Sequence, residues 1–222
     1  MWKFIVYKEW LKIRWFLIGY LILGVLGIGY LFLGLKHSLA FEGSRNLWSK
    51  ILFLNLQFYS SVKYVPLVAG ALLAFMQYLP EAINKRIKLT FHLPVGENRA
   101  LMLMQGFGAG CLLFEMLIFF GLFTGISLIY FPIQMVSDSV ATILPWSLAG
   151  FAAYFIGSLV ILEPNSVFRF FYSLIGVFFL TIYFAPADTA SYKTANASLI
   201  VLTALLSSGF LFSAYRYRKG EV

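Results

Sequence analysis

Charged residues are scarce in this chain of 222 residues: 12% are Asp, Glu, Lys or Arg, whereas 61% are hydrophobic, and the mean hydropathy is +0.85. That charged share is about half of what a soluble domain usually carries. A soluble domain of this size could not bury so much apolar surface, so the lipid bilayer must be part of the solvent. The formal net charge of +8 does not indicate nucleic-acid binding, because the cations form no single stripe with interleaved aromatic residues. They cluster between apolar runs, which is typical of topology determinants and lipid-headgroup contacts.

Cysteine and histidine are nearly absent as well. The single cysteine, Cys111, excludes an internal disulfide, and His37 and His92 lie in different loops with no cysteine or paired acid nearby. We therefore predict no metal site. The sequence also lacks a G-x-x-x-x-G-K-[ST] phosphate loop, a G-x-S-x-G elbow and an H-E-x-x-H pair. The prediction is a chain with no catalytic residues, no cofactor of its own and no enzymatic activity.

Six long apolar runs predict an all-α polytopic membrane protein with six transmembrane helices, in one transmembrane domain over residues 1–222. About 20 apolar residues in a helix are enough to cross a bilayer. The predicted spans are approximately 15–35, 56–79, 101–130, 141–162, 167–184 and 195–214. Residues 1–14 predict an amphipathic helix in the headgroup region, with Lys8, Glu9 and Lys12 on its polar edge. The alternative is a charged flank that holds the N-terminus inside.

The cations also predict which side of the membrane the termini occupy. Six spans place both termini on one side, and the segments on that side hold twelve of the seventeen cations. The positive-inside rule then puts both termini in the cytoplasm. The five remaining cations fall on or near the outer side: Lys36, Arg45, Lys50, Lys63 and Lys193.

Glu115, near the middle of the third span, is a candidate functional residue. A charge at the bilayer centre costs about 2.5 to 3.5 kcal/mol on insertion scales, so it needs a partner. At the helical rise of 1.5 Å per residue, Lys63 on the adjacent antiparallel span falls at a similar depth. One interpretation is a Glu115–Lys63 ion pair, formed directly or through water. The other is a protonated Glu115 that is hydrogen-bonded to a neighbouring helix.

Glycine and proline mark expected features of the helix packing. Pro66 is expected to bend the second span, because it removes an intrahelical hydrogen bond. Four glycines of the third span share an arc of about 100°, which is typical of close helix packing: Gly106, Gly110, Gly121 and Gly125. Four glycines of the first span permit close contacts too: Gly19, Gly24, Gly27 and Gly34.

The longest polar interval, residues 81–99, is predicted to be the main cytoplasmic loop and the place where a soluble partner docks. It carries four cations and two acids: Lys85, Arg86, Lys88, Arg99, Glu81 and Glu97. Glu81 and Lys85 can form an i,i+4 pair on a short helix. Leu93 precedes Pro94 and is pushed out of the helical region, so the chain should break there and restart near residues 96–98. The alternative is an ordinary positive-inside loop.

With these parts in this order, the chain resembles the six-helix membrane (permease) subunits of ATP-binding-cassette exporters, of the type-2 class of bacterial drug, lantibiotic and polysaccharide exporters. The similarity lies in Lys8-Glu9-Trp10-Leu11 before the first span, and in Glu81, Lys85 and Arg86 before Leu93-Pro94-Val95. The family often has Ser where Gly96 stands, and the interval 185–194 is short for the re-entrant helices that many members carry.

The resemblance implies a coupling helix that docks on a separate ATPase subunit. The coupling residues would be Glu81, Lys85, Arg86, Lys88, His92, Leu93 and Pro94. It also implies outward transport of an unidentified substrate across the bacterial inner membrane, ATP and Mg on the partner subunit, and a second permease copy or homologue.

Two other functions fit the sequence: a secondary transporter, and a non-transporting membrane assembly or immunity factor. Against a secondary transporter, the two halves of the chain show no internal repeat, and Glu115 is the one carboxylate expected to be well buried. An ATPase that co-purifies with the chain would distinguish the exporter from both alternatives. Transport that follows an ion gradient without ATP would favour the secondary transporter.

Overall fold

A computed structural model describes residues 2–53, 56–83, 96–185, 189, 191 and 193–219. Its regular elements are all helical, and the described residues contain no strand. In chain order they are α1 (Trp2–Glu42), α2 (Ser44–Phe53), the 3-10 turn η1 (Ser60–Val62), α3 (Val65–Ile83), α5 (Glu97–Tyr130), α6 (Ile133–Leu162), α7 (Ser166–Leu180), the 3-10 turn η2 (Thr181–Phe184), α8 (Asn196–Leu206) and α9 (Phe210–Lys219).

Six segments are long and apolar enough to cross a membrane: Trp2–Phe41, Ser60–Ile83, Asn98–Tyr130, Ile133–Leu162, Ser166–Phe184 and Asn196–Ser213. The predicted fold class, an all-α polytopic membrane protein with six transmembrane helices, is therefore confirmed. The headgroup position of the N-terminal segment stays a prediction.

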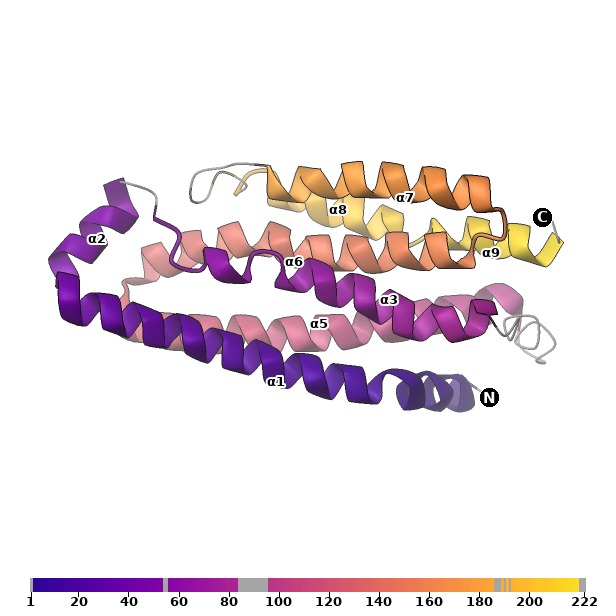
Figure 1. Cartoon of the computed structure of the whole chain (residues 1–222), viewed down its shortest axis with the longest axis horizontal. Coiled ribbons are helices and arrows are strands. Elements are labelled where there is room, and N and C mark those ends of the chain that lie inside the picture. The colour runs from indigo at the N-terminus through magenta and orange to yellow at the C-terminus, as the bar shows by residue number, and fades with distance from the viewer. Residues whose placement is uncertain are drawn as a thin grey trace.

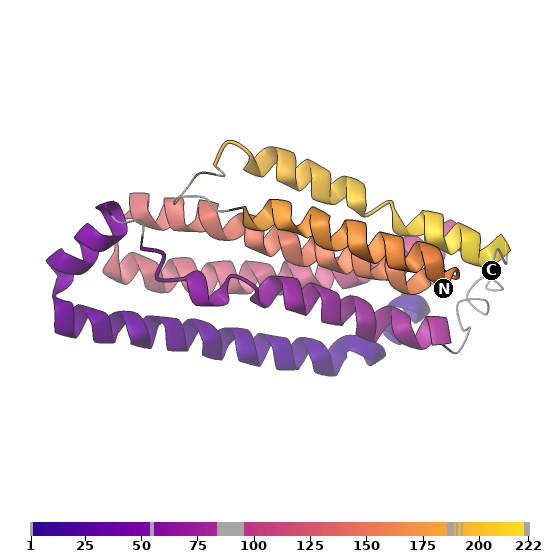
Figure 2. The same ribbon diagram turned by 45° about the horizontal axis from the view of Figure 1, so that its top comes forward.

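The six spans run alternately in opposite directions, and both chain ends lie at the same end of the bundle (Figures 1 and 2). We call this the terminal end. It holds the start of α1, the end of α3, the start of α5, the α6–α7 turn and α9, while α2 caps the opposite end (Figure 1). The sequence correctly placed both termini on one side, and which side of the membrane this is stays a prediction.

The central helix is α6. In its most apolar stretch of 18 residues, 61% of the residues are buried inside the bundle, against 11–33% in the corresponding stretches of the other five spans. It packs most extensively against α3, and also contacts α5, α7, α8 and α9, while α1 packs mainly on α5. Glycines allow the α3–α6 contact: a Cβ added to Gly70 would lie 1.8 Å from the carbonyl oxygen of Gly150. Without side chains at these positions, the two backbones can touch.

The second span is helical only from Val65, after η1 and a turn at residues 63–64. The expected bend at Pro66 is therefore wrong. Pro66 is the second residue of α3, in the first helical turn, where the backbone N–H has no intrahelical acceptor in any case. It thus favours the start of the helix instead of disturbing its middle.

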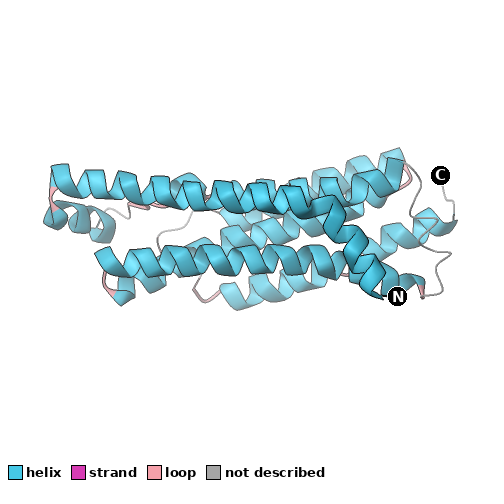
Figure 3. Ribbon diagram, turned by 90° about the horizontal axis from the view of Figure 1, so that it is seen from below, coloured by secondary structure: helices cyan, strands magenta, loops and turns pink. Residues whose placement is uncertain are grey.

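Two other spans differ from the predicted bounds. The first is part of a continuous helix of 41 residues, α1, whose first turns bend away from the long remainder (Figure 3). A helix of that length is about 60 Å long, roughly twice the thickness of a bilayer core. The sixth is divided by a turn at residues 207–209, which separates α8 from α9.

The turns at the ends of α6 are short. Before it, only Phe131 and Pro132 separate α5 from α6, so the fourth span begins eight residues earlier than the predicted Ala141. After it, the side chain of Asn165 caps α7 by accepting a hydrogen bond of 2.9 Å from the backbone N–H of Val167.

The glycine face of the third span does not pack as expected. A Cβ added to Gly106, Gly110, Gly121 or Gly125 would meet nothing within 4 Å, and the same holds for Gly19, Gly27 and Gly34 of α1. The buried face of α5 is a different one, with Met104, Gly108 and Leu112. Small residues show that a close approach is possible, but they do not show that another helix of the chain is there.

Candidate functional site

Four charged residues at the terminal end form a partly buried group that we call the ion-pair cluster: Lys8, Glu9, Lys12 and Glu81. Both carboxylates are fully buried. The Nζ of Lys12 lies 2.5 Å from Oε1 of Glu81 and 2.7 Å from Oε1 of Glu9, and the Nζ of Lys8 lies 2.9 Å from Oε1 of Glu81. Two cations thus balance two anions, whose burial would otherwise cost several kcal/mol each. The cluster joins α1 to the last turn of α3.

A hydrogen-bonded chain continues from the ion-pair cluster into the bundle. Gln77 lies one turn before Glu81 on α3, and its Nε2 donates to Oε2 of Glu9 at 3.0 Å and to the carbonyl oxygen of Met104 at 2.8 Å. The Tyr154 hydroxyl of α6 donates to Oε1 of Gln77 at 2.8 Å. Gln77 therefore connects α3 to α1, α5 and α6 at once.

Tyr78 and Gln105 extend this chain. The Tyr78 hydroxyl donates to Oε1 of Gln105 at 2.5 Å, and lies 3.4 Å from the Tyr154 hydroxyl. Gly108 makes room for these contacts, because a Cβ there would lie 2.2 Å from the Tyr154 hydroxyl and 2.4 Å from Oε1 of Gln77. A buried, well-connected polar network of this kind holds its helices in one arrangement.

A second buried carboxylate group ties the C-terminal helix to the α6–α7 turn. Glu163 is fully buried, and its Oε1 lies 3.2 Å from Nη1 of Arg216 on α9. Its Oε2 accepts a hydrogen bond of 2.9 Å from the Ser213 hydroxyl. Nη2 of Arg169 donates to the Glu163 carbonyl oxygen at 2.6 Å, and the Arg216 guanidinium stacks 4.1 Å above the Phe168 ring. This group lies at the terminal end, as the ion-pair cluster does.

Neither group was predicted from the sequence. We expected Lys8, Glu9 and Lys12 on a headgroup-facing edge, and Glu81 as a partner of Lys85. The expectation that Glu115 would be the one well-buried carboxylate is wrong, because Glu9, Glu81 and Glu163 are buried too. One sequence pattern could have indicated these contacts. Gln77 and Glu81 share one face of the second span, and Glu9 and Lys12 share one face of the N-terminal helix.

The predicted coupling residues divide into two sets. Glu81 is described, and lies in α3 with its carboxylate bound by Lys8 and Lys12. The other six lie outside the described residues: Lys85, Arg86, Lys88, His92, Leu93 and Pro94. The helical restart expected near 96–98 is confirmed, because Gly96 is the N-cap of α5 and α5 begins at Glu97.

Glu115 and Lys63 do not meet. Glu115 is buried on α5 and its Oε2 has no hydrogen-bond partner, and no ion pair within 4.0 Å joins it to Lys63 in the part of the chain that the structure describes. The Nζ of Lys63 instead lies 5.6–5.8 Å from the ring centroids of Tyr64, Trp146 and Phe184. The direct pair was predicted by assuming a helical rise down to Lys63, which lies in the turn before α3.

The described residues hold no group of three or more His, Cys, Asp or Glu side chains placed to bind a metal ion.

In comparisons with known proteins, the chain matches no protein-family model, no curated protein and no solved structure. The resemblance to exporter permeases therefore stays a prediction. The ion-pair cluster and Gln77 link the end of α3 to α1, α5 and α6 through buried polar contacts, so a movement of one of these helices would be passed to the others.

Proposed function

We propose that this chain is the permease subunit of an ATP-driven ATP-binding-cassette exporter in the bacterial inner membrane, with both termini in the cytoplasm. A separate ATPase subunit would dock on residues 81–99 and drive outward transport of a substrate. One observation carries the proposal: Glu81, where this interval begins, anchors the ion-pair cluster and so connects the docking segment to α1.

The contacts around Glu81 would transmit a displacement of residues 81–99 to the helices of the bundle. A push on residues 81–99 would move the end of α3 and the start of α5, which flank the interval directly. Because Lys8 and Lys12 hold Glu81, the first turns of α1 would move with α3. Gln77 would carry the displacement on to α6 through Tyr154. Packed helices joined by buried polar contacts move as a body, as in domain closure around a ligand.

The remaining parts of the assembly follow from the resemblance. ATP and Mg would be bound by the ATPase subunit, and a second permease copy or homologue would complete the transport path. The α6–α7 turn at Glu163 offers a secondary contact for the ATPase subunit, since it lies at the same end of the bundle and is fixed to α9 through Arg216.

The test is a mild-detergent purification of the tagged chain from its native host, with mass spectrometry of the co-purifying proteins. We expect a stoichiometric ATPase subunit that is lost from the Lys85→Glu/Arg86→Glu variant. The matched control is Lys36→Glu/Lys50→Glu, which makes the same charge change away from the docking interval and should retain the subunit. An intact chain that reproducibly purifies without an ATPase subunit would contradict the proposal.

Glu115 favours a second candidate, a proton-coupled secondary transporter. Its carboxyl is buried among the membrane spans without a counter-ion among the described residues, and such groups often carry protons in transporters. Transport by the purified chain in vesicles, driven by a pH gradient without ATP and lost on Glu115→Gln, would support this candidate over the exporter. A non-transporting membrane factor would show neither an ATPase partner nor gradient-driven transport.

A further inference from the structure

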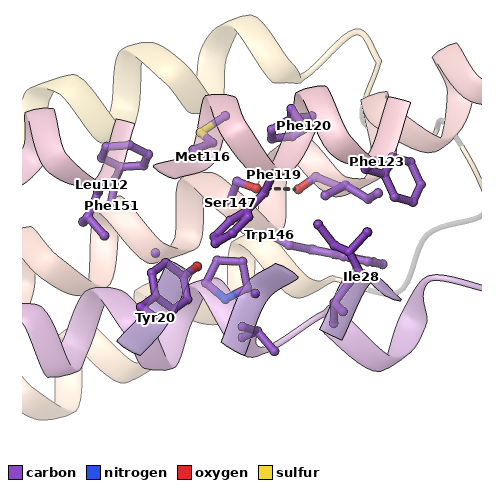
Figure 4. Close-up of a pocket in the computed structure, with 16 residues that line it drawn as sticks. Tyr20, Ile28, Leu112, Met116, Phe119, Phe120, Phe123, Trp146, Ser147 and Phe151 are labelled. Carbon is purple, nitrogen blue, oxygen red and sulfur yellow. Dashed lines mark hydrogen bonds between the residues drawn. The ribbon is translucent and has the colours of Figure 1, made fainter. Parts of the chain in front are cut away.

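A cavity of about 100 Å³ lies between α1, α3, α5 and α6 (Figure 4), and none of its lining residues belongs to the ion-pair cluster. All of its lining residues belong to the candidate membrane spans. Their side chains are apolar except for the hydroxyls of Tyr20 and Ser147 and the indole N–H of Trp146. The cavity is partly open at the protein surface.

The late start of α3 explains the cavity. The second span is not α-helical before Val65, so no α-helix fills the space between α1 and α6 at this level. Phe119, Phe120 and Phe123 of α5 form one wall, and Trp146 of α6 forms another (Figure 4). Among the described lining residues, only Val65 is more than a third exposed, at 42%, so it marks the opening beside the first turn of α3.

Water is a poor occupant of this space. A volume of about 100 Å³ corresponds to roughly three molecules of liquid water, and each buried water needs two to four polar partners. The Ser147 hydroxyl already donates to the carbonyl oxygen of Ile143 in its own helix (Figure 4). Apolar cavities of comparable size stay dry and take up apolar molecules such as benzene. The apolar molecule present at high concentration around this protein is the hydrocarbon chain of the bilayer.

We propose that the cavity binds the end segment of one acyl chain of a membrane lipid, which enters from the bilayer beside Val65. The volume accommodates a few methylene groups, while the rest of the lipid stays in the bilayer. The site would recognise hydrocarbon alone, so it should not select for a headgroup. This inference stands on the cavity and does not depend on the proposed transport function.

Trp146 is a built-in probe, because it lines the cavity and is only 4% exposed at the protein surface. The experiment uses the full chain with Trp146 as its single tryptophan, after Phe replaces the other four: Trp2, Trp10, Trp15 and Trp48. It is reconstituted in phosphatidylcholine vesicles with or without bromine atoms at mid-chain positions, because bromine quenches indole fluorescence on close approach. We expect the fluorescence of Trp146 to fall at least twofold in the brominated vesicles.

Variants that fill the cavity show whether Trp146 is quenched by a lipid chain inside the cavity or by lipid outside the protein surface. Ser147→Leu and Ile143→Phe, each added singly to the Trp146 chain, should reduce the quenching by half or more. The control Val177→Phe adds bulk on the exposed face of α7, away from the cavity, and should leave the quenching unchanged. A chain with Trp15 as its single tryptophan, 71% exposed, reports direct contact with lipid and should be quenched in every background.

Three results would overturn the proposal. One is an unquenched Trp146 in vesicles that quench Trp15. Another is quenching that neither filling variant reduces, although both variants fold. The third is quenching of Trp146 by aqueous iodide but not by brominated chains, which would mean that the cavity holds water.

Discussion

Alanine at Gly70 should separate α3 from α6, the most extensive helix contact in the bundle. The new Cβ would lie 1.8 Å from the carbonyl oxygen of Gly150, whereas ordinary contact begins at 3.4 Å, so the two backbones must move apart by about 1.6 Å. The obstacle is backbone and cannot rotate away as the end of a side chain can. Overpacking of a close-packed interior costs typically 1–3 kcal/mol, and we expect Gly70→Ala to lie at the upper end, about 3 kcal/mol.

The matched control is Gly106→Ala on α5, where a Cβ meets nothing within 4 Å. Alanine is favoured over glycine inside a helix by about 1 kcal/mol. Gly106→Ala should therefore be neutral or slightly stabilising, although it is chemically the same change. Both variants share the higher helix propensity of alanine, so the difference between their unfolding free energies reports the steric effect of the new Cβ at Gly70.

The assay is the free energy of unfolding in mixed micelles, obtained by titrating dodecyl sulfate into a mild detergent and following helicity by circular dichroism. We expect Gly70→Ala to unfold at a clearly lower dodecyl sulfate fraction than the wild type, and Gly106→Ala not to. Equal unfolding free energies for the two variants would refute the close α3–α6 contact.

Three further predictions concern the buried charges. Glu81→Met should destabilise the fold by about 2–3 kcal/mol, somewhat less than the 3–5 kcal/mol for a fully buried pair. Because Lys12 and Glu81 pair directly, the loss for Glu81→Met combined with Lys12→Met should be smaller than the sum of the two single losses; additive losses in the same micelle titration would contradict the pairing. Arg216→Met should expose the C-terminal helix to protease, because it leaves the Glu163 carboxylate without its cation; a cleavage rate equal to that of the wild type would count against this ion pair. Glu115→Gln and Lys63→Met should have stability effects that add to within about 0.5 kcal/mol, and a coupling energy well above that value would show that the two side chains interact.

Hydropathy was sufficient to predict the six spans, because a bilayer requires long apolar helices with internally satisfied backbones. It could not predict where those helices are interrupted. Residues 56–64 were included in the second predicted span yet are not α-helical, and α8 and α9 are separated by a turn inside one apolar run. Apolar composition indicates which segments lie in the membrane, but it does not predict where the backbone within such a segment leaves the α-helical conformation.

The candidate site was harder to predict than the fold, because its residues meet only through the packing of α1 against α3. Glu9 and Glu81 are 72 positions apart, and each has lysines close to it in the sequence. Local pairing rules therefore gave each glutamate a plausible neighbour on its own segment. The same limit applies to glycine: the pattern at 106, 110, 121 and 125 is regular, whereas the contact that matters joins single glycines, Gly70 and Gly150, on two helices.

The proposed function is tested most directly by the rate of ATP hydrolysis of the proposed ATPase subunit, once it is co-purified and reconstituted with this chain in vesicles. We expect the wild-type chain to change the ATPase rate, and Lys85→Glu/Arg86→Glu to return it to the value of the ATPase subunit alone. The control Lys36→Glu/Lys50→Glu should behave as the wild type does. A Lys85→Glu/Arg86→Glu chain that couples as well as the wild type would contradict the assignment of residues 81–99 as the docking segment.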